Sequence, residues 1–316
     1  MAVASAPGKL ILFGEHFVVY GLPAIATAID SRTTANVRRA DEYALVDDRP
    51  ETPGYKKEKL AQQKDSVQRI LRAMNLAGAN VRITLGGELV AASGVGASGA
   101  SCSAIAAALN EEFGLRLDRE KINAVAYEGE KGYHGTPSGI DNSCSTFGGF
   151  IWFEKDLMSG LGEIRSLDMK IPMTIVMGNT GVTSNTTEVV EEVRKEREKN
   201  PEKFGGIFED YRRIAEEARE VLEMKDLNSI GRLMNRNHEL LRRIGLSSPD
   251  LEKLVEIALG NGAMGAKLTG TGRGGLMIAL VDDETKDKVA SAMEKAGYDS
   301  KITTIGAEGV QIEKEP

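Results

Sequence analysis

The sequence predicts an α+β protein of two domains, on three observations. Its 316 residues are about twice the length of a typical single domain, and 41% of them are hydrophobic, which suffices for packed cores. Short apolar runs and longer segments with helical spacing follow one another without a strict β–α alternation. Loop-like sequence containing glycine occupies residues 156–170. We therefore expect domains at residues 1–165 and 166–316.

The apolar pattern predicts the elements of each half. In the first half we expect strands at residues 10–13, 33–39, 81–85 and 148–153, with helices over 65–77 and 101–113. Asp118 is a suitable N-cap for a further helix, and the polar segment 47–64 predicts a surface excursion. In the second half we expect a strand at 173–177, helices over 186–200, 207–224, 226–244 and 249–260, a glycine-dense turn within 265–281, and a helix then a strand over 282–312.

Composition excludes several classes of protein. The 40 Lys and Arg residues against 47 Asp and Glu residues give a net charge of −7, which argues against a sequence-independent grip on nucleic acid. Two cysteines, Cys102 and Cys144, cannot form a disulfide framework, and three scattered histidines do not suggest a histidine-rich metal site. No apolar run approaches the ~20 residues of a membrane span, and the N-terminus does not resemble a secretory signal. We expect a soluble, cytoplasmic protein.

A small-residue loop at 93–101 (SGVGASGAS) is the most informative local segment. It follows a strand-like stretch and opens an alanine-rich helix, so backbone N–H groups and the helix N-terminus favour a bound phosphate. The Ser98 hydroxyl suits a magnesium ion on such phosphates. An ordinary tight turn explains the local sequence about equally well. Gly94, Gly96 and Gly99 also match the dinucleotide-binding fingerprint, but the acid at the required offset, Asp118, begins a helix rather than ending a strand. We therefore reject a dehydrogenase.

Three further segments carry chemical groups. The stretch from Glu130 to Asn142 (EKGYHGTPSGIDN) contains two carboxylates, Glu130 and Asp141, joined by a Gly/Pro-rich loop. One could bind a cation while the other accepts a proton from a hydroxyl; a polar surface loop is the alternative. Lys9 with the Glu15–His16 turn, and the glycine-dense turn 267–275, are each common features alone. No Walker A motif or protein-kinase catalytic loop is present.

Together and in this order, these segments resemble the GHMP small-molecule kinases. The motifs are PGK (7–9) with GEH (14–16), GVGAS (94–98) and KLTGTG (267–272); LFGEHFVVYG (12–21) and GYHGTPSGIDN (132–142) are similar to the mevalonate kinase branch in particular. The resemblance runs from about residue 5 to about residue 280. Two departures are Ala97, where a second serine is usual, and Arg273, which interrupts a run of glycines.

The resemblance implies a ribosomal-protein-S5-like N-terminal domain, a ferredoxin-like C-terminal domain, and ATP-dependent phosphorylation of the 5-hydroxyl of (R)-mevalonate. Asp141 would accept the hydroxyl proton and Lys9 would stabilise the charge; Ser98 and Glu130 would hold Mg²⁺; Glu15, His16 and Thr180 would orient the substrate. The ATP phosphates would lie on the loop formed by Gly94, Val95, Gly96, Ala97, Ser98, Gly99, Ala100 and Ser101. A homodimer is expected.

Other classes remain open at this point. They are phosphomevalonate kinase, homoserine kinase, diphosphomevalonate decarboxylase and a non-catalytic binding protein of the same fold.

Overall fold

The structure is a computed structural model, which describes residues 1–91, 94–155, 157, 162–167, 172–182 and 185–314. The chain forms two compact units: residues 1–10, 27–151 and 306–316 make the first, and residues 11–26 and 152–305 make the second. Neither unit is contiguous, because strands β1 (Ala2–Phe13) and β2 (Ala24–Arg39) each contribute residues to both. The units therefore differ from the contiguous limits 1–165 and 166–316, which stay a prediction.

The first unit contains a mixed sheet. Besides parts of β1 and β2, it includes β3 (Ala44–Asp47), β4 (Val81–Gly87) and β11 (Gln311–Glu313). Strand β2 pairs antiparallel with β4, β3 runs parallel to β4, and the first residues of β1 pair antiparallel with β11. The C-terminal strand thus completes the sheet that the N-terminal strand begins.

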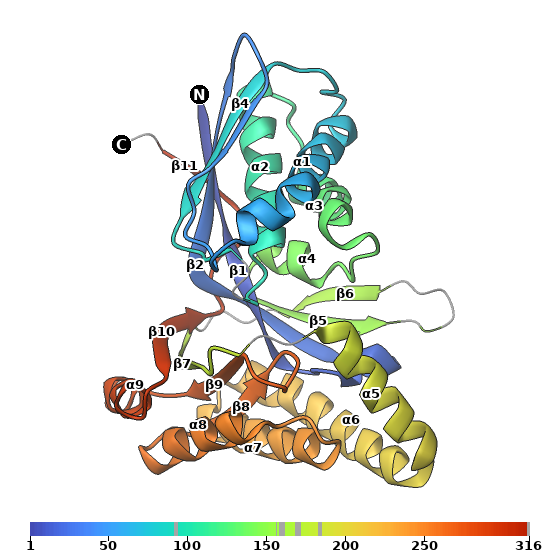
Figure 1. Cartoon of the computed structure of the whole chain (residues 1–316), viewed down its shortest axis with the longest axis vertical. Coiled ribbons are helices and arrows are strands. Elements are labelled where there is room, and N and C mark those ends of the chain that lie inside the picture. The colour runs from blue at the N-terminus through green and yellow to red at the C-terminus, as the bar shows by residue number, and fades with distance from the viewer. Residues whose placement is uncertain (92–93, 156, 158–161, 168–171, 183–184, 315–316) are drawn as a thin grey trace. The chain divides into compact units, whose positions relative to one another are not determined.

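Four helices lie together on one side of this sheet (Figure 1): α1 (Tyr55–Ala73), α2 (Ala97–Phe113), α3 (Arg119–His134) and α4 (Ile140–Phe147). Helix α2 packs against α1, α3 and α4. Its alanines, including Ala100, Ala104 and Ala107, are fully or almost fully buried. Small side chains are needed there because α2 is enclosed by neighbours on several sides.

The second unit contains an antiparallel sheet in the order β10-β7-β9-β8. These strands are β7 (Met173–Asn179), β8 (Gly265–Thr269), β9 (Leu276–Leu280) and β10 (Asp299–Ile305). Numbered along the chain, the order is 4-1-3-2, with helices after the first and third strands. This is the split βαβ arrangement of ferredoxin-like domains. The remaining strands, β5 (Phe150–Lys155) and β6 (Gly162–Leu167), pair with each other.

The helices of the second unit are α5 (Thr186–Lys199), α6 (Pro201–Met224), α7 (Leu227–Arg243), α8 (Pro249–Gly260) and α9 (Lys286–Lys295). Helices α7 and α8 pack on β8, and α9 packs on β7 and β10. The short 3-10 helix η1 (Phe17–Tyr20) is held by Phe17, which stacks on Tyr211 of α6 with 4.0 Å between ring centroids. No helix within the described residues is long and apolar enough to span a membrane.

The predicted α+β mixture is confirmed, and most predicted elements are present with shifted ends. Asp118 caps α3 by accepting a hydrogen bond from the Lys121 amide, as predicted. The prediction for residues 47–64 is wrong in part: α1 begins at Tyr55, and the Arg49 side chain is buried. Strand β1 begins eight residues before the predicted run, because pairing with β11 supports small residues of low strand propensity.

Candidate active site

The small-residue loop turns directly into α2. Gly94 and Gly96 have φ values of 79° and 71°, a left-handed conformation that glycine adopts without strain. Gly96 is the N-cap of α2, so the first N–H groups of the helix have no acceptor within it. A helix start of this form can bind a phosphate, and binding at residues 94–101 stays a prediction; Ser93 lies outside the described residues.

Strand β1 carries Lys9 to this loop. The Lys9 amide donates to the Val95 carbonyl at 2.8 Å. A Cβ at Gly8 would stand 2.6 Å from the Val95 carbonyl oxygen, and one at Gly96 would stand 2.7 Å from Cγ of Lys9. The two glycines thus permit the close approach of strand and loop that places the Lys9 side chain beside the start of α2.

Helix α4 brings Asp141 to the same place. A Cβ at Gly99 would stand 2.7 Å from the Asp141 carbonyl carbon, so the first turns of α2 and α4 are in direct contact. The Ser145 hydroxyl ties α4 to β1 by donating to the Pro7 carbonyl at 2.8 Å. As a result, Lys9 Nζ and Asp141 Oδ1 form an ion pair at 3.0 Å. Burial alone would lower the pKa of Lys9, but the Asp141 carboxylate outweighs burial and raises it.

Helix α3 supplies a buried carboxylate at Glu130, which is 1% exposed. The Ser98 hydroxyl lies 3.4 Å from His134 Nε2, and Glu130 Oε2 lies 3.9 Å from the same nitrogen. Burial and the negative charge of Asp141 raise the pKa of Glu130 to about 8, although Ser98 and Lys9 oppose them. Near neutral pH a substantial share of this carboxyl group is therefore protonated in the protein alone.

Cys102 lies next to Glu130, with its sulfur 3.9 Å from Oε1. The thiol is fully buried, and burial together with the Glu130 charge raises its pKa well above the usual value. Cys102 is therefore an inert packing residue rather than an activated thiolate at the helix start.

The Glu15–His16 turn lies in the second unit against β8 and the glycine-dense turn after it. Glu15 forms an ion pair with Lys267 of β8, and both side chains are buried. His16 Nε2 lies 3.1 Å from the Thr271 carbonyl oxygen, and burial lowers its pKa. His16 is therefore neutral near pH 7.

Arg273 belongs to the glycine-dense turn, and Thr180, directly after β7, is hydrogen-bonded to it. The Thr180 amide donates to the Gly275 carbonyl at 2.9 Å, and its hydroxyl accepts from the Gly275 amide at 2.8 Å. Arg273 reaches outward to Glu192 of α5, with 3.1 Å between Nη2 and Oε2. Glu15, His16 and Thr180 therefore converge on one region of the second unit, while the Arg273 side chain pairs at the surface.

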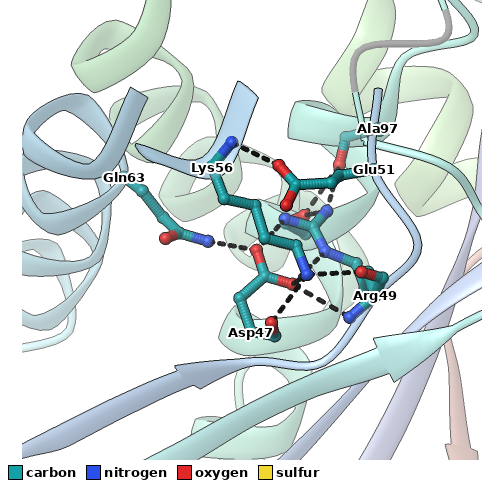
Figure 2. A network of polar contacts seen from close by, with 7 residues as sticks. Asp47, Arg49, Glu51, Lys56, Gln63 and Ala97 are labelled. Atoms are coloured by element: carbon teal, nitrogen blue, oxygen red, sulfur yellow. Dashed lines mark hydrogen bonds and ion pairs between the residues drawn. The ribbon is translucent and has the colours of Figure 1, made fainter. Parts of the chain in front are cut away.

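A pocket opens beside the start of α2 in the first unit. It is lined by Asp47, Arg49, Tyr55, Lys56, Lys59, Gln63, Ala91, Ala97, Ser98 and Tyr133. Arg49, Lys56 and Lys59 make its wall basic, although the whole chain is acidic. Figure 2 shows the polar network at its base, in which Asp47 lies between Arg49, Lys56 and Gln63.

Sequence reasoning missed two sets of residues. The sequence motif marks Lys267 only as its first residue, although a lysine inside an apolar strand indicates a buried partner. Asp47 and Arg49 were assigned to a surface excursion, and their i, i+2 spacing carries no pattern that distinguishes a buried pair from a solvated one. Within the described residues, no three His, Cys, Asp or Glu side chains form a metal-binding cluster.

The chain is similar to known proteins over almost its whole length. The family models described as GHMP kinases N terminal domain and GHMP kinases C terminal match residues 63–149 and 214–299. A mevalonate kinase of Pyrococcus furiosus is 35% identical over 337 aligned positions, covering 99% of this chain and 98% of that protein. A mevalonate kinase of Thermococcus gammatolerans is 36% identical with the same coverage.

The chain belongs to the mevalonate kinase family. A crystal structure of L. major mevalonate kinase in complex with R-mevalonate is 34% identical, has a TM-score of 0.90, and the match covers 98% of this chain and 97% of that one. The predicted GHMP kinase fold of two domains is thereby confirmed. For a mevalonate kinase family member, the Lys9–Asp141 pair beside the loop is the feature that calls for a chemical explanation.

Proposed function

We propose that the protein transfers the γ-phosphoryl group of ATP to the 5-hydroxyl of (R)-mevalonate, forming 5-phosphomevalonate and ADP. The full-length similarity to mevalonate kinases supports this, as does the neighbouring structure with bound R-mevalonate. The observation that carries the proposal is the 3.0 Å pair of Lys9 and Asp141 next to the first turn of α2. A proton acceptor and a cation thus stand beside a phosphate-binding helix end.

Residues 94–101 would hold the ATP phosphates through the unpaired N–H groups at the start of α2. The basic wall of the pocket next to this loop would attract an anionic nucleotide. Backbone donors make this cradle independent of side-chain identity at Val95 and Ala97, so the missing second serine does not remove it.

Ser98 and Glu130 fit a magnesium ion. Their oxygens are hard ligands, and a cation would offset the burial and the Asp141 charge that raise the pKa of Glu130. Mg²⁺ is commonly held by one or two protein oxygens together with substrate phosphates and water, which matches this small donor set. The bound ion would neutralise charge on the phosphates.

Asp141 would act on the mevalonate hydroxyl. As the hydroxyl oxygen bonds to the γ-phosphorus and the bond to the β,γ-bridging oxygen breaks, the hydroxyl proton passes to the Asp141 carboxylate. Since an alcohol is a far weaker acid than Asp, this transfer accompanies bond formation rather than preceding it. Lys9, kept protonated by Asp141, would neutralise charge that develops on the transferring phosphoryl group.

Glu15, His16 and Thr180 would orient mevalonate through the glycine-dense turn of the second unit. Because the Thr271 carbonyl can only accept, Nε2 of neutral His16 carries the proton, and Nδ1 can accept one further hydrogen bond. The Lys267 ion pair holds Glu15 in place. The same proposal includes a cytoplasmic location. It also includes a homodimer, which sedimentation velocity of the purified protein tests.

A panel assay tests the reaction. ADP release measured with mevalonate, phosphomevalonate, homoserine and galactose should be fastest with mevalonate. A preference for phosphomevalonate or homoserine would assign a sister kinase. Release of CO₂ from diphosphomevalonate would assign the decarboxylase, and no ADP release with any alcohol would indicate a binding protein.

Asp141→Asn tests the assigned role. We expect kcat to fall by about 100-fold or more, because the amide cannot take the proton, while the KM for ATP changes by less than about threefold. The matched control is Asp118→Asn, which makes the same chemical change at the exposed N-cap of α3, where Asn is an equally good cap. Turnover near the wild-type rate in Asp141→Asn would remove Asp141 from the mechanism.

A further inference from the structure

Arg49 lies buried between β3 and the phosphate-binding end of α2, with 4% of its side chain exposed. Its Nε donates to Asp47 Oδ1 at 2.9 Å and its Nη2 donates to Asp47 Oδ2 at 2.7 Å. This two-point pairing fixes the plane of the guanidinium group, which a single hydrogen bond would not do.

The remaining terminal nitrogen of Arg49 contacts α2. Nη1 donates to the Ala97 carbonyl oxygen at 3.3 Å and to the Ser101 hydroxyl oxygen. The Ser101 hydroxyl in turn donates to the Ala97 carbonyl at 2.7 Å. Arg49 therefore contacts the start of α2 at two atoms one helical turn apart, the Ala97 carbonyl oxygen and the Ser101 hydroxyl oxygen.

Helix α1 holds this arrangement from the other side. Lys56 Nζ donates to the carbonyl oxygens of Asp47, at 2.8 Å, and of Arg49. Gln63 donates from its side-chain amide to Asp47 Oδ2 at 2.6 Å. Asp47 and Arg49 are thus anchored in both side chain and backbone, and the guanidinium position follows from α1 and β3 rather than from a ligand.

All three side-chain nitrogens of Arg49 donate to atoms of this chain, in four hydrogen bonds. A direct bidentate grip on phosphate would require breaking these bonds. A buried ion pair is also a weak source of net stability, since apolar residues of the same volume often serve as well. The geometry therefore favours a role in setting the position of α2.

We propose that Arg49 is a positioning residue for the nucleotide site, acting through Ser101 and the Ala97 carbonyl. It holds the first turn of α2 so that the N–H groups of that turn point at the ATP phosphates. This inference rests on the proposed binding of ATP at residues 94–101, and it does not depend on which alcohol accepts the phosphoryl group.

A double-mutant cycle with Arg49→Lys and Ser101→Ala tests the proposal. Lysine keeps the positive charge but lacks the paired N–H donors of the guanidinium group. Alanine removes the Ser101 hydroxyl that accepts a hydrogen bond from this group. For Arg49→Lys we expect a Kd for Mg·ATP, from calorimetric titration without acceptor, raised about tenfold, and a KM for mevalonate within about twofold of wild type. Ser101→Ala should weaken Mg·ATP binding severalfold.

The double variant should bind Mg·ATP within about twofold of Arg49→Lys alone, because both substitutions break the same contact. The matched control is Arg69→Lys, the same substitution in an exposed pair with Asp65 on α1, which should leave both constants unchanged. Ser101→Ala makes only a small change, so it keeps the test valid if Arg49→Lys folds poorly.

Three results would overturn the inference. Fully additive effects would mean that Arg49 contacts the nucleotide directly. Equal losses of Mg·ATP and mevalonate affinity would mean a general structural role, and unchanged Mg·ATP affinity would mean no role. Failure of the proposed function looks different, because the wild-type protein would then bind no Mg·ATP or would release no ADP with mevalonate.

Discussion

Glu130→Gln should make the protein more stable at neutral and alkaline pH while impairing its use of Mg·ATP. The wild-type carboxyl group is buried beside Asp141, and its pKa rises from 4.5 to about 8. Folding therefore favours the protonated form. Glutamine has nearly the same shape and stays neutral, so it removes the cost of ionising this position.

The sign and size of the effect follow from linkage. Below pH 4.5 the carboxyl group is protonated in both the folded and unfolded states and costs nothing. As the pH rises from about 4.5 to about 8, the unfolded chain ionises first, so the folded state loses stability. Since one pKa unit corresponds to about 1.4 kcal/mol, the loss reaches roughly 3 kcal/mol at pH 7 and up to about 5 kcal/mol above pH 8.

Thermal unfolding between pH 5 and pH 9, without nucleotide or Mg²⁺, measures this loss. The unfolding midpoint of Glu130→Gln should be higher than that of the wild type, and the difference should grow by roughly 5–10 °C between pH 5 and pH 9. This value assumes that 1 kcal/mol of stability shifts the midpoint by about 2 °C. Glu120→Gln, an exposed change on the same helix, should show no widening margin.

Binding of Mg·ATP provides a second test of the raised pKa of Glu130. A cation near Glu130 favours the ionised form, so wild-type binding should release a proton near pH 7, seen as a buffer-dependent enthalpy, and Glu130→Gln should release fewer protons. Parallel pH profiles of the two proteins, together with equal proton release, would refute the reasoning about this carboxyl group.

Two other substitutions separate binding from stability. Lys267→Met should lower the free energy of unfolding, measured by denaturant unfolding, by about 3–5 kcal/mol, because it leaves the Glu15 carboxylate buried without a partner. Adding Glu15→Gln should restore most of this loss. A Lys267→Met protein as stable as the wild type would contradict the importance of the Lys267–Glu15 pair. Ser98→Ala removes one oxygen ligand, so it should raise the KM for Mg·ATP by about tenfold and change the KM for mevalonate little. Steady-state kinetics measure both constants. Equal effects on the two substrates would count against a metal-binding role for Ser98.

Much of the fold could be predicted because local chemistry decides it. The N-cap at Asp118, and the proline-led helices at Pro201 and Pro249, begin where the residue types favour a helix start. The predicted helix over 207–224 began too late. The helix begins at Pro201, because proline suits the N1 position, whereas the pattern of apolar residues alone indicates a later start.

The candidate site shows the limit of such reasoning. Lys9 and Asp141 were singled out as separate motifs 132 residues apart, and either could have been an ordinary surface residue. Only packing of α4 on β1 and α2, permitted by Gly99 and Gly8, brings the two side chains to 3.0 Å. The raised pKa of Glu130 likewise depends on burial and on a neighbour eleven positions away, neither of which a local pattern reports.

By itself, the sequence determined the α+β class, the glycine turn that opens α2 and the family, because turn glycines, caps and motif order are local properties. The tertiary structure decided which charges are buried and which meet: Lys9 with Asp141, Lys267 with Glu15, and Arg49 with Asp47 and α2. The physical reason is that the energy of a charge depends on the solvent and partners around it, and these are supplied by segments distant in the chain.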